Sequence, residues 1–236
     1  MRRGLRIAAT VATTLGAALV AATPAESANE CEGLQVCVPI AGPWVSLSNG
    51  GGTSRAGVAW QLTCPRGYIV GGLDAELTHR AIDVSFLGRL GSPVNPGITT
   101  TRSATFLATY VGASSGARSF KPHIGCMPTS GGGSRVPTSV SVFPPGQPVT
   151  RRAKTVRVRP GSATVTQSCR ARERLVGASH AFGFFTRTPP SASLMSSVTG
   201  SRTVGGDTVR VSVRGDAELG GVRAVIQVHA LCARAA

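Results

Sequence analysis

Negative charge and lysine are both scarce in this chain. Its 236 residues include 10 Asp and Glu against 25 Lys and Arg, so the formal net charge is +15 at pH 7. Lysine occurs only at Lys121 and Lys154, so nearly all of the positive charge is arginine. A high-GC genome would explain arginine in place of lysine, but it would not explain the shortage of acidic residues. The charge excess favours anionic partners such as cell-wall polymers, acidic lipids, polysaccharides or nucleic acid.

Long apolar runs are missing after the first 28 residues, so we expect no transmembrane segment in the mature chain. The N-terminus begins with three arginines within its first six residues. An uncharged, mostly apolar run follows from Ile7 to Ala22, and small residues come next. This order predicts a secretory signal peptide over residues 1–28, with cleavage after Ala25 or Ser27.

The alternative for this segment is an N-terminal membrane anchor, but its apolar run is shorter than the roughly 20 residues that a spanning helix needs. We therefore expect a secreted protein that lies outside the cell or in the cell envelope. Removal of residues 1–28 takes away three arginines and one glutamate, which leaves a net charge of +13.

Metal-binding cysteine pairs are also missing. No Cys-x-x-Cys occurs and no histidine stands at ligand spacing from two cysteines, so we expect neither a metal site nor a cofactor. An even number of cysteines in an exported chain instead predicts disulfide bonds, although spacing alone does not choose among the pairings. All of the cysteines follow the predicted signal: Cys31, Cys37, Cys64, Cys126, Cys169 and Cys232.

Two stretches of the chain are similar to each other. The segment Cys64-Pro-Arg-Gly-Tyr-Ile-Val-Gly-Gly72 aligns with Cys169-Arg-Ala-Arg-Glu-Arg-Leu-Val-Gly-Ala178 if the second has one extra residue. Each stretch follows an alternating segment, and each half closes on a His-x-x-Cys, which ends at Cys126 and at Cys232. We infer a tandem duplication of one unit.

The duplication predicts both the domain boundaries and the disulfides. We expect an N-terminal cysteine loop at 29–39, a first unit at 40–128, a linker at 129–154 and a second unit at 155–236. Equivalent cysteines should make equivalent bonds, which pairs Cys64 with Cys126 and Cys169 with Cys232. Cys31 and Cys37 would then close the small N-terminal loop.

Period-two alternation predicts an all-β fold. Thr208–Arg214 alternates strictly, with three valines on one face. Short segments of this kind, separated by Gly, Pro, Ser and Asn clusters, are typical of antiparallel sandwiches or barrels. We therefore expect two tandem, related antiparallel β units, sandwich or barrel-like and stapled by disulfides. Residues 171–178 are a weak helix candidate, and the linker has room for one strand at 139–143.

Basic residues gather on both sides of the predicted start of the second unit. Two arginines on one strand face and three more in the next segment would form two stripes, which together make an anion-binding face. Guanidinium groups suit phosphate and carboxylate. The alternative is a solvated face that discourages edge-to-edge aggregation. The candidate residues are Arg151, Arg152, Lys154, Arg157, Arg159, Arg170, Arg172 and Arg174.

Other polar residues give weaker signals. His123 and His229 occupy matching positions, each on the strand face opposite its own cysteine, which common descent explains. Two Asp-x-Glu pairs, at 74–76 and 216–218, would each place two carboxylates on one strand face, and we interpret them as surface charge. The Pro-containing loop at 91–97 is interpreted as a plain turn. No nucleophile or phosphate-binding motif occurs, so we assign no catalytic residue.

The opening of the first unit supports one resemblance. Cys64-Pro-Arg-Gly-Tyr-Ile-Val-Gly-Gly72, followed by a strand that reaches Cys126, resembles a pattern in exported proteins of high-GC Gram-positive bacteria. There, Cys-Pro-x-Gly and a Val-Gly-Gly step begin a β-rich unit that a late cysteine closes. The second unit departs from this pattern, because residues 170–172 read Arg-Ala-Arg and Ala178 replaces the second glycine. The resemblance implies secretion and β structure, and it implies no particular function.

Three functions follow from these patterns. The first is a non-enzymatic secreted protein that binds an anionic cell-wall polymer or acidic surface through the arginine-rich region. Nucleic acid is a poorer partner, because stacking aromatics are not interleaved with the arginines. The second is an extracellular hydrolase, which Asp74 or Glu76 beside His79 in a cleft would favour. The third is a structural envelope component without a ligand.

Overall fold

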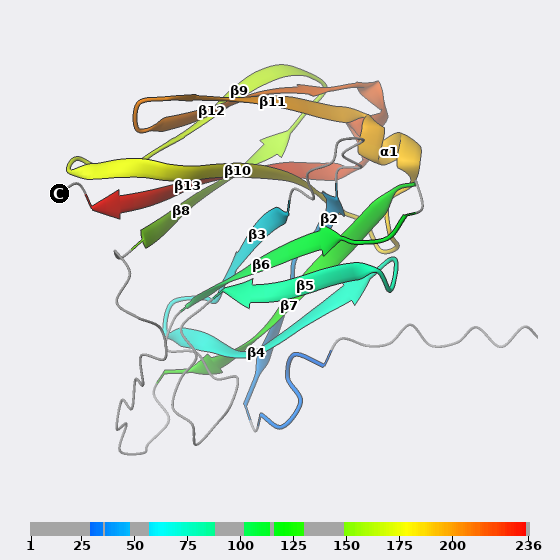
Figure 1. Ribbon diagram of the computed structural model, residues 1–236. Coiled ribbons are helices and arrows are strands. Elements are labelled where there is room, and N and C mark those ends of the chain that lie inside the picture. The colour runs from blue at the N-terminus through cyan, green and yellow to red at the C-terminus, as the bar shows by residue number, and fades with distance from the viewer. Residues whose placement is uncertain are drawn as a thin grey trace, which may run out of the picture.

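The fold is built almost entirely from β-strands (Figure 1). The computed structural model describes residues 29–34, 36–47, 57–87, 102–113, 116–129 and 149–234. Within these ranges, helices are limited to a five-residue α1 at Ala192–Ser196 and a 3-10 helix, η1, at Ala217–Gly221. The prediction of an all-β, disulfide-stapled fold is confirmed.

The first half of the chain forms two layers around one core. Strand β7 pairs with β4 on one side and with β1 and β2 on the other, while β6 lies between β3 and β5 in a separate sheet. Trp60, Phe106 and Phe120 fill the space between the layers and are almost completely buried. The strands are β1 (Val38–Ala41), β2 (Trp44–Leu47), β3 (Val58–Thr63), β4 (Tyr68–Leu77), β5 (Ile82–Leu87), β6 (Ser103–Tyr110) and β7 (Arg118–Pro128).

The second half has the same arrangement. Strand β13 lies between β10 and β8, and β12 lies between β9 and β11 in a separate sheet that covers this layer in Figure 1. Its core contains Phe184, Val209, Val211, Ile226 and Val228. The strands are β8 (Val149–Val158), β9 (Gly161–Ser168), β10 (Glu173–Phe185), β11 (Val198–Gly205), β12 (Thr208–Gly215) and β13 (Arg223–Arg234).

Strand registers match between the halves, including an irregularity. In β4, the pairing shifts between Val70, opposite Cys126, and Gly72, opposite Gly125. In β10, the pairing shifts between Leu175, opposite Cys232, and Gly177, opposite Leu231. Gly71 and Val176 are therefore equivalent bulge residues.

This match corrects the sequence alignment. Cys64 and Val70 are separated by the same number of residues as Cys169 and Leu175, so no extra residue stands between the cysteine and the bulge of the second half. Alternation alone does not reveal a bulge, because the bulged residue shifts the side-chain parity locally.

All three predicted disulfides are present. Cys31 bonds Cys37, Cys64 bonds Cys126, and Cys169 bonds Cys232. Cys64 follows β3 and is bonded to β7, and Cys169 follows β9 and is bonded to β13. Each of these long disulfides therefore joins the two layers of its half. Closing loops of 62 and 63 residues contributes about 4 kcal/mol each in the chain-entropy model.

Several expected boundaries differ from the observed ones. Strand β8 begins at Val149, so the last residues of the predicted linker form an edge strand that pairs with β13. The weak helix candidate at 171–178 is wrong, because β10 begins at Glu173 and pairs with β13. Asp216 and Glu218 lie at the start of η1, where Asp216 caps the Glu218 N–H, and not on a strand. The signal segment, the 91–97 loop and the 139–143 strand lie outside the described residues.

The N-terminal cysteine loop packs on the outer face of the β4–β7 pair. The backbone N–H of Asn29 donates to Asp74 Oδ2 at 2.6 Å. The carbonyl of Glu30 lies where a Cβ of Gly72 or Gly125 would be, so the loop can dock only because both residues lack a side chain. In the second half, Leu231 takes the place of Gly125, and no such loop covers that position among the described residues.

We predict that Gly72→Ala destabilises the protein by about 2 kcal/mol, because the added Cβ overlaps the Glu30 carbonyl. The matched control is Gly177→Ala, where the added Cβ lies 3.3 Å from Leu231 Cβ and needs only a small adjustment. Urea denaturation of the two variants measures the difference. Equal free energies of unfolding for both variants would contradict the docking that the structure shows.

Candidate functional site

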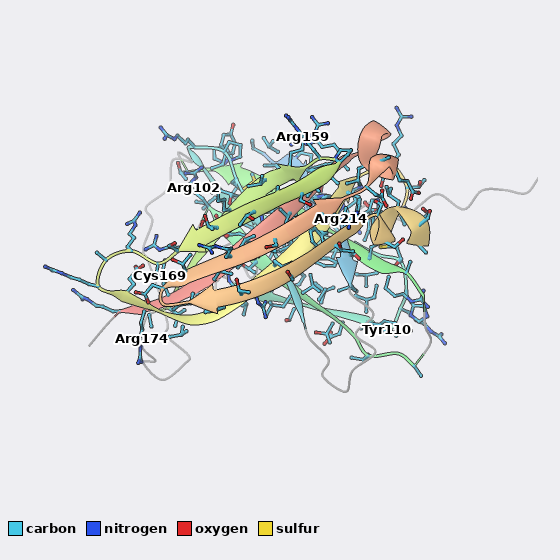
Figure 2. The ribbon with its side chains drawn as sticks, turned by 90° about the horizontal axis from the view of Figure 1, so that it is seen from above. Arg102, Tyr110, Arg159, Cys169, Arg174 and Arg214 are labelled. Carbon is cyan, nitrogen blue, oxygen red and sulfur yellow. A yellow bond between two sulfur atoms is a disulfide. The ribbon has the colours of Figure 1, made fainter. Side chains whose placement is uncertain are left out.

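The eight predicted basic residues do not lie together on one face. Five of them lie near the Cys169–Cys232 end of the second half, since Arg151 and Arg152 pair with Leu231 and Ala230 and the other three follow Cys169. Lys154 lies in the middle of β8. Arg157 and Arg159 lie toward the opposite end, and Figure 2 shows Arg159 and Arg174 far apart on the second half.

The turn between β9 and β10 carries the densest group of exposed arginines. We call Arg170, Arg172 and Arg174 the arginine tip; all three are exposed. The turn is closed by a hydrogen bond from the Glu173 N–H to the Arg170 carbonyl. The interpretation of residues 170–174 as one extended stripe is therefore wrong, because Arg170 and Arg172 lie in a tight turn and Arg174 lies in β10.

Glu173 holds this turn in place. Its carboxylate accepts from Nε and Nη2 of Arg152, with Nη2 2.6 Å from Oε1, and from the backbone N–H of Arg170 at 2.8 Å. These donors, Arg152 first, lower the pKa of Glu173, so the carboxylate is ionised at neutral pH. Arg152 is thus neutralised by Glu173 and acts as a support, and Arg170 contacts the same carboxylate through its backbone N–H.

Arg172 adopts a backbone conformation that arginine rarely takes. Its φ is 67°, in the left-handed region, and it is the only non-glycine residue with positive φ in the described part of the chain. The equivalent turn of the first half has Gly67 there, with φ 82°. A side chain in this region costs about 1–2 kcal/mol. An arginine at this position therefore needs a reason other than the turn itself.

The β8 residues differ in their surroundings. Arg151 is partly buried, which lowers the pKa of its guanidinium, and it points to the side of β13 that carries His229. Arg157 is exposed on the same strand face as Arg151, while Arg152 and Lys154 are on the other. The strand therefore distributes its charges over two faces.

A second polar surface lies on the outer face of the β9–β12–β11 sheet, onto which Figure 2 looks. An open groove of about 620 Å³ crosses it. We call it the hydroxyl groove, and its outward side chains include Ser162, Thr164, Thr199, Ser201, Ser212 and Arg214. The strict alternation of Val209, Val211 and Val213 already placed Ser212 and Arg214 on the opposite face. The strand neighbours that complete the groove depend on register, which the sequence does not give.

The hydrolase hypothesis depended on a carboxylate beside His79. Glu76 instead lies beside His123, with Oε1 2.8 Å from Nε2, and beside Lys121 Nζ at 3.0 Å. Glu30 covers the other side of the imidazole, with Oε1 3.7 Å from Nδ1. The His123 side chain is only 6% exposed, and its contact with Glu30 fastens the N-terminal loop to β7.

Among the described residues, one group of side chains has the spacing of metal ligands: Cys169, Glu173 and Cys232. Both cysteines are consumed by their disulfide, and the Glu173 carboxylate is occupied by Arg152 and Arg170. Thiolate ligation is therefore unavailable at this position.

His229 is completely buried, and the backbone of Ala59 in the first half faces its ring. It shares a face of β13 with Val225 and Gln227, which contact the first half. Burial lowers the pKa of His229 from 6.5 to about 4, and the charge of Arg151 acts in the same direction. The imidazole is therefore neutral in the folded protein at pH 7.

No protein-family model, curated protein or solved structure matches this chain. In the described part of the chain, no helix has the length and apolar character needed to cross a membrane.

We predict that the protein loses stability as the pH falls from about 6.5 toward about 4. In this window the unfolded chain binds a proton at His229 that the folded protein excludes, because its folded pKa is near 4. The free energy of unfolding should fall by up to about 3 kcal/mol from this residue. His180, whose pKa burial and then Arg202 lower, acts in the same direction.

Urea denaturation at a series of pH values measures this slope. His229→Leu should flatten it, because leucine does not titrate and needs no hydrogen bond. His79→Leu removes an imidazole elsewhere and serves as the matched control. An unchanged slope in His229→Leu would contradict the assignment.

Proposed function

We propose that this protein binds an anionic polymer or surface through the arginine tip, Arg170, Arg172 and Arg174. The proposal is supported by the excess of positive charge in the chain and by the exposure of these three residues on one turn. Guanidinium groups bind phosphate, sulfate and carboxylate oxygens in bidentate fashion. The Glu173–Arg152 pair beneath them fixes the turn without covering its outer side.

The backbone of Arg172 is the observation that carries the proposal. In the first half, Gly67 occupies the left-handed position of the equivalent turn. In the second half, Arg172 occupies this position, although glycine adopts the left-handed conformation at no cost. Strain of this kind persists where a side chain has a role that a better-fitting residue cannot fill. For an exposed arginine between two others, that role is charge.

We also propose that the protein acts outside the cell and that its two halves arose by duplication. The three disulfides support an oxidising compartment. The matched bulges and two equivalent hydroxyl pairs support duplication: Thr63 Oγ1 lies 2.8 Å from Ser103 Oγ, and Ser168 Oγ lies 2.8 Å from Thr208 Oγ1. Anionic cell-wall material is the partner that this setting favours.

Arg172→Gly tests the function, because binding and stability should move in opposite directions. The variant should be more stable by about 1 kcal/mol, since the strain is relieved. Its affinity for immobilised heparin, used as a general polyanion, should fall by about tenfold, and both proteins should bind more weakly as salt is raised. Urea denaturation and salt elution from the heparin matrix measure the two effects.

The matched control is Arg66→Ser, which removes one exposed charge from the equivalent turn of the first half. It should leave heparin elution close to that of the unmodified protein. Equal weakening by both variants would mean that only net charge matters. An Arg172→Gly protein that binds heparin normally would rule out the arginine tip as the binding surface.

A further inference from the structure

We propose that the hydroxyl groove is a second binding site, which takes a linear chain of phosphate groups such as a polyphosphate or a polyol-phosphate polymer. This inference goes beyond the arginine tip, because the groove lies on another surface and is built from other residues. Its ligand class follows from three properties of the groove: the order of its side chains, the groups it lacks, and its comparison with the first half.

Side chains in the groove form three rows across the sheet. Arg214 lies between Thr199 of β11 and Ser162 of β9 in one row. Ser212 lies between Ser201 and Thr164 in the next row. All of these side chains are exposed and point outward, because the alternate residues of β12 are buried valines.

A third row completes the pattern. Arg210 lies between Thr203 and Thr166, so its row repeats the row of Arg214, with hydroxyls on both sides of a guanidinium. Arg210 and Arg214 are four residues apart on one strand, about 14 Å at roughly 3.4 Å per residue. The outer face of the sheet therefore has two equal cationic positions joined by a row of hydroxyl groups. Arg214 lines the groove, and Arg210 lies outside its lining, farther along the same strand face.

These groups match phosphate chemistry. A guanidinium donates two parallel hydrogen bonds to one phosphate, and the flanking Ser and Thr hydroxyls can donate to the remaining oxygens. A ligand with repeated phosphates can occupy both cationic positions at once, which multiplies its affinity over that of a single anion. No carboxylate occurs among the nine outward positions of the three rows to oppose it.

The groove also lacks aromatic side chains. Nucleic-acid bases bind on aromatic platforms by stacking, and none of the nine outward positions carries an aromatic residue. Single-stranded nucleic acid would therefore gain only its backbone contacts here. A polymer that is recognised only through its phosphate groups does not need aromatic side chains, so their absence does not reduce its affinity.

The first half shows that the fold does not require this pattern. By register, Arg210, Ser212 and Arg214 correspond to Thr105, Leu107 and Thr109, and Thr199 corresponds to Asp83. The same sheet thus lacks both arginines, has a leucine in its middle row and carries a carboxylate at the edge. The equivalent face of the first half is also partly covered, since Thr105 and Ala59 are buried there, so the exposed pattern of hydroxyls and arginines belongs to the second half alone.

Ser212→Leu tests the groove without changing the net charge, because it installs the residue of the first half in the middle row. Isothermal titration with linear inorganic polyphosphate should show an affinity reduced by at least about tenfold, since the leucine blocks the path between the two arginines. Thr164→Leu, on the neighbouring strand, should give the same result and guards against a local folding defect. Thermal unfolding confirms that each variant is folded.

Charge variants provide the second arm. Arg210→Ser with Arg214→Ser should weaken polyphosphate binding by about a hundredfold. The control with the same change in charge is Arg80→Ser with Arg187→Ser, two exposed arginines outside both surfaces, which should retain most of the affinity. Equal loss in both double variants would overturn the site, because it would show binding by net charge alone.

The outcomes separate this inference from the proposed function. If Ser212→Leu and Thr164→Leu bind polyphosphate normally while Arg172→Gly does not, the groove is overturned and the arginine tip stands. If the leucine variants lose binding and Arg172→Gly keeps it, the groove stands without the tip. If single-stranded poly(U) RNA or hyaluronate binds the groove as tightly as polyphosphate, the phosphate-chain ligand class is overturned.

Discussion

The arrangement of this molecule depends on one shared strand. Val45 of strand β2 pairs with Phe120 of β7 in its own half. Val45 also pairs with Gly183 of β10 in the other half. Gly183 has no side chain, and a Cβ there would overlap Pro43 and crowd Trp60, so the two sheets can join only at a bare position. Four strands of the first half and three of the second therefore become one continuous seven-stranded layer with covering sheets.

The side chain of Gln227 strengthens the contact between the two halves, because it makes the hydrogen bonds that a neighbouring strand would make. The amide of Gln227 accepts from the backbone N–H of Gln61 at 2.6 Å and donates to its carbonyl at 3.1 Å, as a neighbouring residue in a sheet would. The edge of β3 is thereby satisfied without a further strand. Because the first half contacts β10 and β13 through this face, the outer sheet β9–β12–β11 remains turned toward solvent, where the hydroxyl groove lies.

Much of the fold could be predicted from the sequence, because it depends on local periodicity and on repeated spacing. Alternating valines identified β12, and matching cysteine spans identified both long disulfides. The start of β8 could not be predicted, since an edge strand rich in arginine has the composition of a linker. The bulges at Gly71 and Val176 were missed because they interrupt the alternation that serves as the signal.

The candidate sites could be predicted less well from the sequence than the fold. Sequence proximity grouped eight basic residues, but a strand separates its members by about 3.3 Å per residue, so Arg159 ends far from Arg174 (Figure 2). The ion pair between Arg152 and Glu173 could not be predicted, because the two residues are far apart in the sequence and only the fold brings β8 and the start of β10 together. The hydroxyl groove combines strands that are not neighbours in sequence, and only their register brings Thr199 and Ser162 to opposite sides of Arg214.

The N-terminal cysteine loop covers, on β7, the face that β13 uses to contact the first half. The face of β13 that receives the first half carries Val225, Gln227 and His229, and the equivalent face of β7 carries Ser119, Lys121 and His123. On β7, a lysine replaces the glutamine that bridges to β3, and Glu30 occupies the space in front of the histidine. The cysteine loop therefore covers the surface of β7 that corresponds to the contact surface of β13.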